Sequence, residues 1–581
     1  MLLDTLLVGW GLINHNAFVA TYPYINISLA FTGPVNFQSF VIDLVLHVDH
    51  VTVAALLVIE IGVLGILGWH RVMGRSEPGP ARFYAMVSAM LFGFAGALLS
   101  LDLAELIAFW GIAGVMTYLM LAQRWGSDEA ARSSRIALAL PFLADISFLC
   151  GVGWLHARYG LHRIDTLLPI LHTTAGWTVR AIVVGSVLLF IGIVGRLAIV
   201  PFHLWITRTA LTAPPAASAI AQSAWPVLAI VVLYRVMPIF AASNVQTVRV
   251  CMYVCAAAAV AAPLMALFGN EPRRVIALLG AGAVAAGAAV LIHAYEDIHF
   301  TFAVAGIACV LAAAPARAAG TMLASVMAGA MRTDDMAEMG DAWNRMRTTS
   351  VALLLAGLVL AFSALGALAF GVSTRSWLGV ALGEAVLLIA IGGVRVFLAV
   401  SIGPLRRRRA FEPDRVTEGN LPSGAIAWAF VLGLAGATML VASLIKGWLD
   451  FLDGHKHPAP AVGSFAVWVG VVAVGLALTV GAYVRDKDGA LRASTLSGAR
   501  LEAWNATAGA WIDRFLVAPM TNIAQRVELG LQAGDGAVGT LSGESGRLAL
   551  AASRAQGIAL VLMLGVGLAV LVALFAPGVL R

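Results

Sequence analysis

Long apolar runs separated by short polar stretches follow one another along most of the chain. A run of about 20 apolar residues has the length that a helix needs to cross a bilayer. These runs predict membrane-spanning helices at residues 1–20, 46–69, 83–102, 103–122, 135–155, 178–200, 216–241, 248–268, 273–293, 300–331, 349–371, 377–402, 424–446, 463–484 and 555–577. The pattern therefore predicts an all-α polytopic membrane protein with about 14–16 transmembrane helices.

The first run, residues 1–20, is also open to interpretation as a signal sequence. It contains Asp4 and His15, but it has no basic start and no small-residue cleavage site. We therefore interpret it as a membrane helix.

The composition agrees with a membrane protein, since 60% of the residues are hydrophobic and only 12% are charged. No soluble core needs so large an apolar share. The net charge of +6 does not indicate nucleic acid as a partner, because the basic residues lie in short loops. Clusters of this kind are Arg71, Arg75 and Arg82, then Arg124, Arg132 and Arg135, and finally Arg406 to Arg409. Loops rich in arginine predict the cytoplasmic side of the membrane.

No cofactor or metal site is predicted. The four cysteines, Cys150, Cys251, Cys255 and Cys309, all fall in apolar runs, without the spacing of an iron–sulfur or zinc ligand set. The histidines are scattered. The glycines at 280 and 282 lie inside a predicted membrane helix, where they favour helix packing over a dinucleotide loop.

An arginine inside an apolar helix is the strongest sign of function. Arg196 stands five residues before Pro201, which must interrupt the helix. A charge at bilayer depth is costly and usually faces an ion or substrate path. Transporters build midplane sites from broken helices. The alternative is an arginine that extends to the membrane surface beside an ordinary kink.

A second interruption is predicted between Ala361 and Arg375, where glycines and small residues break up a helix. Two such interruptions indicate two inverted repeats with broken helices. The predicted units are residues 1–82 (N-terminal helices), 83–245 and 246–403 (two antiporter-like repeats), 404–485 (C-terminal helices), 486–554 (a lateral helix) and 555–581 (a terminal anchor). Ile523, Val527 and Leu531 share one face and support an amphipathic lateral helix, against the alternative of a disordered linker.

Several segments, taken in order, resemble the antiporter-like L subunit of proton-pumping NADH:quinone oxidoreductase (complex I), which is related to Mrp-type cation/proton antiporters. The segments are Phe109–Leu119, Gly195–Trp205, Pro215–Ala219, Pro272–Leu278, Asp334–Gly340 and Trp511–Pro519. The last is similar to the start of that subunit's long lateral helix.

The chain departs from the family's pattern at the positions that carry charge. The resemblance places a glutamate at Gly111, a lysine at Arg196 and a histidine at Gln222. It also places a lysine at Arg317, with a histidine at Ala313, and a lysine at Thr374, beside Arg375. Asp145 matches a family acid, and Glu384 lies deep in its own span, so both are candidate partners for the arginines.

These departures predict a weakened or rewired proton route. A buried lysine can titrate near neutral pH, whereas arginine stays charged and glutamine carries no proton charge. The candidate ion-path residues are Arg196, Asp145, Gln222, Arg317, Arg375, Glu384 and His203.

The resemblance implies a membrane subunit of a complex I-like enzyme in the cell's inner (cytoplasmic) membrane, with other membrane subunits and lipid as partners. Its role would be proton or cation translocation coupled to electron transfer elsewhere, so its own status as an enzyme stays open. The alternatives are an Mrp-type antiporter subunit, the membrane subunit of an inorganic-carbon uptake complex, or a structural subunit that does not pump. The tail favours the first, and the lost glutamate and lysine favour the last.

Overall fold

The computed structural model describes most of the first 403 residues and little of the chain beyond residue 485. The described residues are 2–12, 17–28, 39–74, 79–124, 128–160, 163–172, 177–296, 303–372, 376–403 and 462–485, with isolated positions between 429 and 452 and between 507 and 522. The predicted lateral helix at 486–554, the anchor at 555–581 and the predicted span at 424–446 therefore lie wholly or largely outside the described residues.

Twelve helices in the described part are long and apolar enough to cross a membrane. Each coincides with one of the predicted spans. They are α2 (His50–Met73), α3 (Pro80–Leu99), α4 (Leu103–Leu121), α5 (Asp128–Tyr159), α7 (Trp177–Leu197), α9 (Pro215–Ser243), α10 (Val245–Phe268), α11 (Pro272–Glu296), α12 (Ala303–Met331), α14 (Arg347–Gly371), α15 (Trp377–Ser401) and α18 (Val462–Arg485). Short helices lie between them: α6 (Ile164–His172), α8 (Leu204–Thr212) and α13 (Ala342–Arg345). The all-α polytopic class is confirmed.

Side-chain caps fix where several of these helices begin. Asp49 precedes α2 and accepts a hydrogen bond from the Thr52 backbone N–H at 2.7 Å. Asp102 precedes α4 and accepts a hydrogen bond from the Ala104 backbone N–H at 2.7 Å. Such caps satisfy backbone donors that a helix start leaves unpaired. Asp102 is therefore a helix cap, as expected for a residue near a loop.

The prediction of a membrane helix at residues 1–20 is wrong. Residues Leu2–Leu12 form α1, and Ala17–Ser28 form strand β1, which pairs antiparallel with β2 (Ser39–Asp49). Eleven helical residues extend roughly 16 Å, about half of a bilayer core. Aromatic and β-branched residues after position 17 favour a strand instead.

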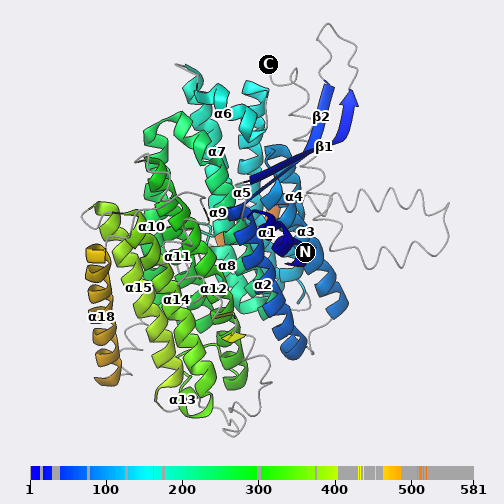
Figure 1. Cartoon of the computed structure of the whole chain (residues 1–581). Helices are drawn as coiled ribbons and strands as arrows, with labels where there is room; N and C mark the ends of the chain where they lie inside the picture. The colour runs from blue at the N-terminus through cyan, green and yellow to red at the C-terminus, as the bar shows by residue number, and fades with distance from the viewer. Residues whose placement is uncertain are drawn as a thin grey trace, which may run out of the picture.

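The hairpin is fastened to the bundle at its second strand. The backbone N–H of Val45 donates to the Glu105 carboxylate at 3.0 Å, and the Val45 carbonyl accepts from the Leu101 N–H at 3.1 Å. The hairpin projects from the end of the bundle opposite α13 (Figure 1). Glu105, in the first turn of α4, thus attaches the hairpin to this end of the bundle.

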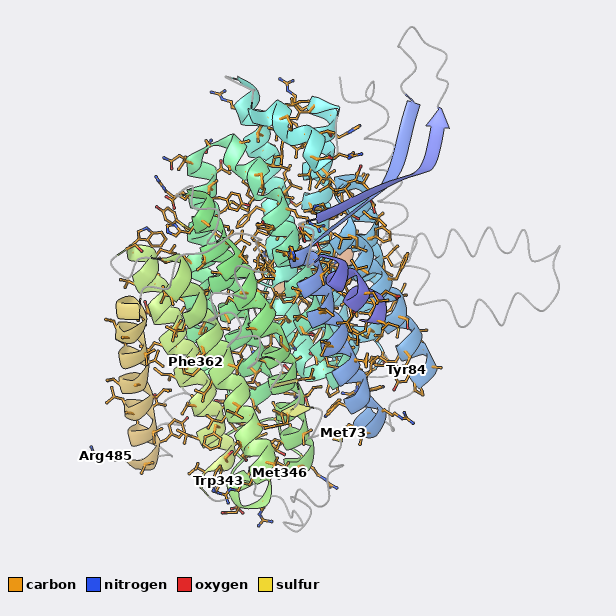
Figure 2. The ribbon with its side chains drawn as sticks, in the orientation of Figure 1. Met73, Tyr84, Trp343, Met346, Phe362 and Arg485 are labelled. Atoms are coloured by element: carbon orange, nitrogen blue, oxygen red, sulfur yellow. The ribbon has the colours of Figure 1, made fainter. Side chains whose placement is uncertain are left out.

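The other end of the bundle gathers the basic loops. Figure 2 shows Trp343 and Met346 at that end of the bundle, and Met73 at the lower end of α2. The helix ends and turns there carry Arg71, Arg82, Arg124, Arg273, Arg274, Arg345 and Arg347. Two of the segments that carry the family resemblance meet in this region, because Arg273 on α11 pairs with Asp334 at 3.0 and 2.6 Å.

The interruption predicted between Ala361 and Arg375 is wrong for residues 361–371, where the structure describes a continuous helix. α14 continues without a break to Gly371, and residues 373–375, including Arg375, lie outside the described part. Glycine does not break this helix, because small residues let helices approach closely in membranes. Gly357 of α14 lies directly against Gly393 of α15, where an added Cβ would be 2.9 Å from the opposing Cα.

Candidate functional site: an arginine–aspartate pair at a broken helix

The helix that carries Arg196 ends as the sequence predicts. α7 stops at Leu197, Ala198 adopts a left-handed conformation (φ 56°), and α8 begins at Leu204. The Gly195 carbonyl at this break accepts hydrogen bonds from the Ala198 backbone N–H at 3.3 Å and from the Trp205 indole N–H at 3.1 Å. Backbone freed inside a membrane must be satisfied by protein or water. The break is therefore a built feature with its own side-chain cap.

Arg196 is buried, with 4% of its side chain exposed, and it forms a two-point ion pair with Asp145 of α5. Its Nε donates to Asp145 Oδ1 at 2.9 Å, and its Nη2 donates to Oδ2. The indole N–H of Trp110 on α4 also donates to Oδ1, at 2.7 Å. The predicted pairing of Arg196 with Asp145 is present, and both carboxylate oxygens are occupied.

Aromatic rings enclose the pair. The Arg196 guanidinium lies 3.9 Å from the ring centre of Trp225 on α9. The Trp225 indole donates to Thr117 at 2.9 Å, and its ring meets Trp110 edge-on at 5.2 Å. A desolvated cation over a tryptophan face gains about 2 kcal/mol. Four helices, α4, α5, α7 and α9, therefore hold one charged pair against aromatic rings.

The pair lies at bilayer depth. Trp225 is the eleventh of the 29 residues of α9, so it is roughly 15 Å from the start of that helix. Asp145 lies near the middle of the 32-residue α5. A charge at this depth normally faces the protein interior and marks function.

Gly114 on α4 leaves the space that the guanidinium fills. A Cβ added there would lie 2.5 Å from Arg196 Nη2, whereas a Cβ added at Gly111 on the same helix meets no atom within 4 Å. We predict that Gly114→Ala lowers the free energy of unfolding by about 1–3 kcal/mol, because it displaces a packed side chain. Gly111→Ala should be neutral or stabilise slightly, since alanine favours helices. Thermal unfolding of the two purified variants checks this, and equal melting temperatures would contradict it.

A second arginine lies in the other half of the bundle without a comparable partner. Arg317 is fully buried near the middle of α12, and in the part of the chain that the structure describes none of its three guanidinium nitrogens has a hydrogen-bond partner. Gln222 of α9 donates to Ser218 at 2.7 Å and makes a long contact of 3.4 Å with Thr321, one turn after Arg317. α9 therefore contacts both arginine regions. Its Trp225 packs against Arg196, and its Gln222, one turn earlier, contacts Thr321 of α12.

The remaining predicted residues are not brought to this pair. Glu384 is exposed on α15, along the face that also exposes Trp377 and Val380, so the prediction that it partners an arginine is wrong for the described residues. Glu384 follows Val380 by four residues and Trp377 by seven, so the three side chains share one face of the helix. His203 is buried in the helix break, and neither ring nitrogen has a hydrogen-bond partner among the described residues.

Sequence reasoning missed other functional candidates. Trp225 carries no charge, so only the packing of α9 on α7 shows its contact with Arg196. Arg235 and Arg395 are buried arginines inside predicted spans, and the rule that singled out Arg196 applies to them equally. Arg235 donates to the Ser100 carbonyl at 2.8 Å and to Thr52 at 2.7 Å, beside the hairpin junction.

The site can hold charge more readily than it can transfer protons. Arginine does not release its proton in proteins, and Asp145 already accepts three hydrogen bonds at its two oxygens. No group of three or more histidine, cysteine, aspartate or glutamate side chains suited to a metal occurs among the described residues. The geometry therefore fits a fixed ion pair.

Residues 100–398 match the sequence profile of the NADH:quinone oxidoreductase/Mrp antiporter transmembrane family. NADH-quinone oxidoreductase subunit L of Neisseria meningitidis is 25% identical over 50% of this chain and 43% of that protein. NAD(P)H-quinone oxidoreductase chain 5 of Synechocystis sp. is 25% identical over 35% of this chain and 30% of that protein. The chain thus spans less than half of these curated relatives. A structure of the Mrp complex from Dietzia sp. shares the fold, with a TM-score of 0.58 and 17% identity over 85% of this chain and 92% of that chain.

Proposed function

Because this chain belongs to the NADH:quinone oxidoreductase/Mrp antiporter transmembrane family, we propose that it is a membrane subunit of a complex I-like NADH:quinone oxidoreductase. It contributes to proton or cation translocation that is driven by electron transfer in other subunits. The chain supplies no redox centre in this proposal. Its partners are neighbouring membrane subunits and lipid.

The observation that carries the proposal is the buried Arg196–Asp145 pair beside a broken helix, within the segment that matches the family. Paired charges beside interrupted helices are the usual form of an intramembrane ion site. Since arginine does not titrate, this site supplies a fixed field, and the proton path through the chain is weakened. Gln222, Arg317 and His203 are proposed to line the remainder of that path, with Arg375 as a further candidate.

We further propose that the repeats comprise residues 83–245 and 246–403, with the boundary in the first turn of α10, just after its cap Asn244. The end that gathers the arginine-rich loops faces the cytoplasm, because positive loops stay on that side. The membrane is then the cell's inner membrane, and the hairpin lies on the opposite side from the electron-transfer subunits.

Three alternatives remain distinct proposals. An Mrp-type antiporter subunit is favoured by the structural similarity to an Mrp complex. A structural subunit that does not pump is favoured by the three hydrogen bonds that both oxygens of Asp145 together accept from Trp110 and Arg196. The membrane subunit of an inorganic-carbon uptake complex would instead bind a large soluble zinc-binding partner.

Purification of the tagged full-length chain in mild detergent distinguishes these assignments. We expect co-purification with other membrane subunits and with flavin- and iron–sulfur-containing subunits that reduce quinone. Recovery of membrane subunits alone would favour the antiporter assignment. Recovery with a zinc-binding soluble partner, and without redox subunits, would contradict the proposal in favour of carbon uptake.

A further inference from the structure

Five arginines are buried in the described part of the chain, and four of them have partners that offset their charge. Arg196 and Arg273 each pair with an aspartate through two hydrogen bonds. Arg235 donates to Thr52, which itself donates to Asp49. Arg395 donates to the Gly269 carbonyl at 2.9 Å, at the negative end of α10. Arg317 is the exception.

The residues around Arg317 leave space for its aliphatic carbons but offer its guanidinium no carboxylate. Its side chain lies against Gly280 of α11, where an added Cβ would be 2.5 Å from the Arg317 Cδ. Its nitrogens Nε, Nη1 and Nη2 have no hydrogen-bond partner among the described residues. The guanidinium is therefore accommodated sterically but is not neutralised electrostatically.

The helices that pack on α12 cannot supply a carboxylate at this level. α9 and α14 contain no aspartate or glutamate, and the acid of α11 is its last residue, Glu296, which pairs with Arg249 at 2.7 Å. Glu296 is sixteen residues from Gly280, roughly 24 Å along the helix. Glu60 of α2 accepts a hydrogen bond from Thr5 of α1 through Oε1, and neither of its oxygens reaches a nitrogen of Arg317. The span predicted at residues 424–446, whose Gly436 approaches Ala316, contains no acid either.

We propose that Arg317 binds a small monovalent anion, with chloride as the expected ion, in the interior between α9, α11 and α12. Buried charges are kept only when they are paired. Water could satisfy the N–H donors but would leave the charge uncompensated. An anion satisfies both requirements, and Thr321 and Gln222 place polar groups one helical turn away. This anion site does not depend on which complex contains the chain.

The test compares thermal unfolding of the purified full-length protein in sodium chloride and in sodium gluconate at equal ionic strength. Gluconate is too large to replace chloride in a buried site. We expect the wild type to melt about 3 °C higher in saturating chloride, because an ion that binds only the folded state stabilises it. Arg317→Met should abolish this difference and should melt in gluconate at or above the wild type, since it removes an uncompensated charge. Arg317→Lys should retain the chloride effect.

Arg196→Met is the matched control. It should lower the melting temperature in both salts, because it strands Asp145, while the chloride effect remains. An equal chloride effect in the wild type and in Arg317→Met would overturn the proposal, as would the absence of any effect. Arg317→Met melting below the wild type in gluconate would also overturn it. Anomalous scattering from wild-type crystals grown in bromide needs no variant: a peak at the Arg317 guanidinium supports the site, and its absence contradicts it.

Discussion

Arg196→Met is expected to lower the free energy of unfolding by about 3–5 kcal/mol, and Asp145→Asn in the same chain is expected to recover most of that loss. Removing one member of a buried ion pair leaves the other charge unpaired, which costs more than the pair itself contributes. The double variant removes both charges. Its asparagine keeps an oxygen that can accept from Trp110, whose N–H donates to Asp145 at 2.7 Å.

A double-mutant cycle on the purified protein measures this coupling, with thermal or denaturant unfolding as the readout. The cycle needs Arg196→Met, Asp145→Asn and the combined variant. Independent, additive losses would show that the two side chains are not energetically paired. A combined variant less stable than either single variant would contradict the account just as directly.

The combination of Arg196→Lys with Gly111→Glu is expected to raise the number of protons translocated per electron pair above the wild-type value. Lysine has a pKa that burial can move toward the working pH, whereas arginine stays charged. A Cβ added at position 111 meets no atom within 4 Å, so the backbone there leaves space for the first carbon of a side chain. Position 111 lies one turn before Gly114, which adjoins the Arg196 guanidinium. The two changes therefore introduce a titratable pair.

Vesicles that contain the reconstituted complex provide the measurement. Arg196→Lys alone and Gly111→Glu alone are the controls, and each should leave the yield near the wild-type value. A yield that does not rise in the double variant, despite intact assembly, would mean that Arg196 is not what limits this route.

The membrane architecture was predictable because each span is a continuous apolar run, which only a helix can bury in lipid. Arg196 and Asp145 were predictable as partners because each is a charge in such a run. The structure of the N-terminal region was not predictable, since one apolar stretch contains a helix up to Leu12 and a strand from Ala17. Hydrophobicity alone does not separate an apolar strand from an apolar helix.

The parts of the site that escaped prediction depend on contacts between helices. The ring of Trp225 over Arg196 follows from how α9 packs on α7. The exposure of Glu384 follows from the face that α15 turns outward, which depth along a span does not reveal. The unpaired state of Arg317 among the described residues required knowledge of every neighbouring helix.

The central claim is that Arg196 and Asp145 form a fixed pair that does not carry protons. Proton yield per electron pair, measured in vesicles for the wild-type complex and for the complex with Arg196→Met and Asp145→Asn, tests it most directly. Both side chains are neutral in this variant, so assembly should survive. The account predicts the wild-type yield. A large loss of yield in a fully assembled complex would show that protons pass through this pair, and would contradict the account.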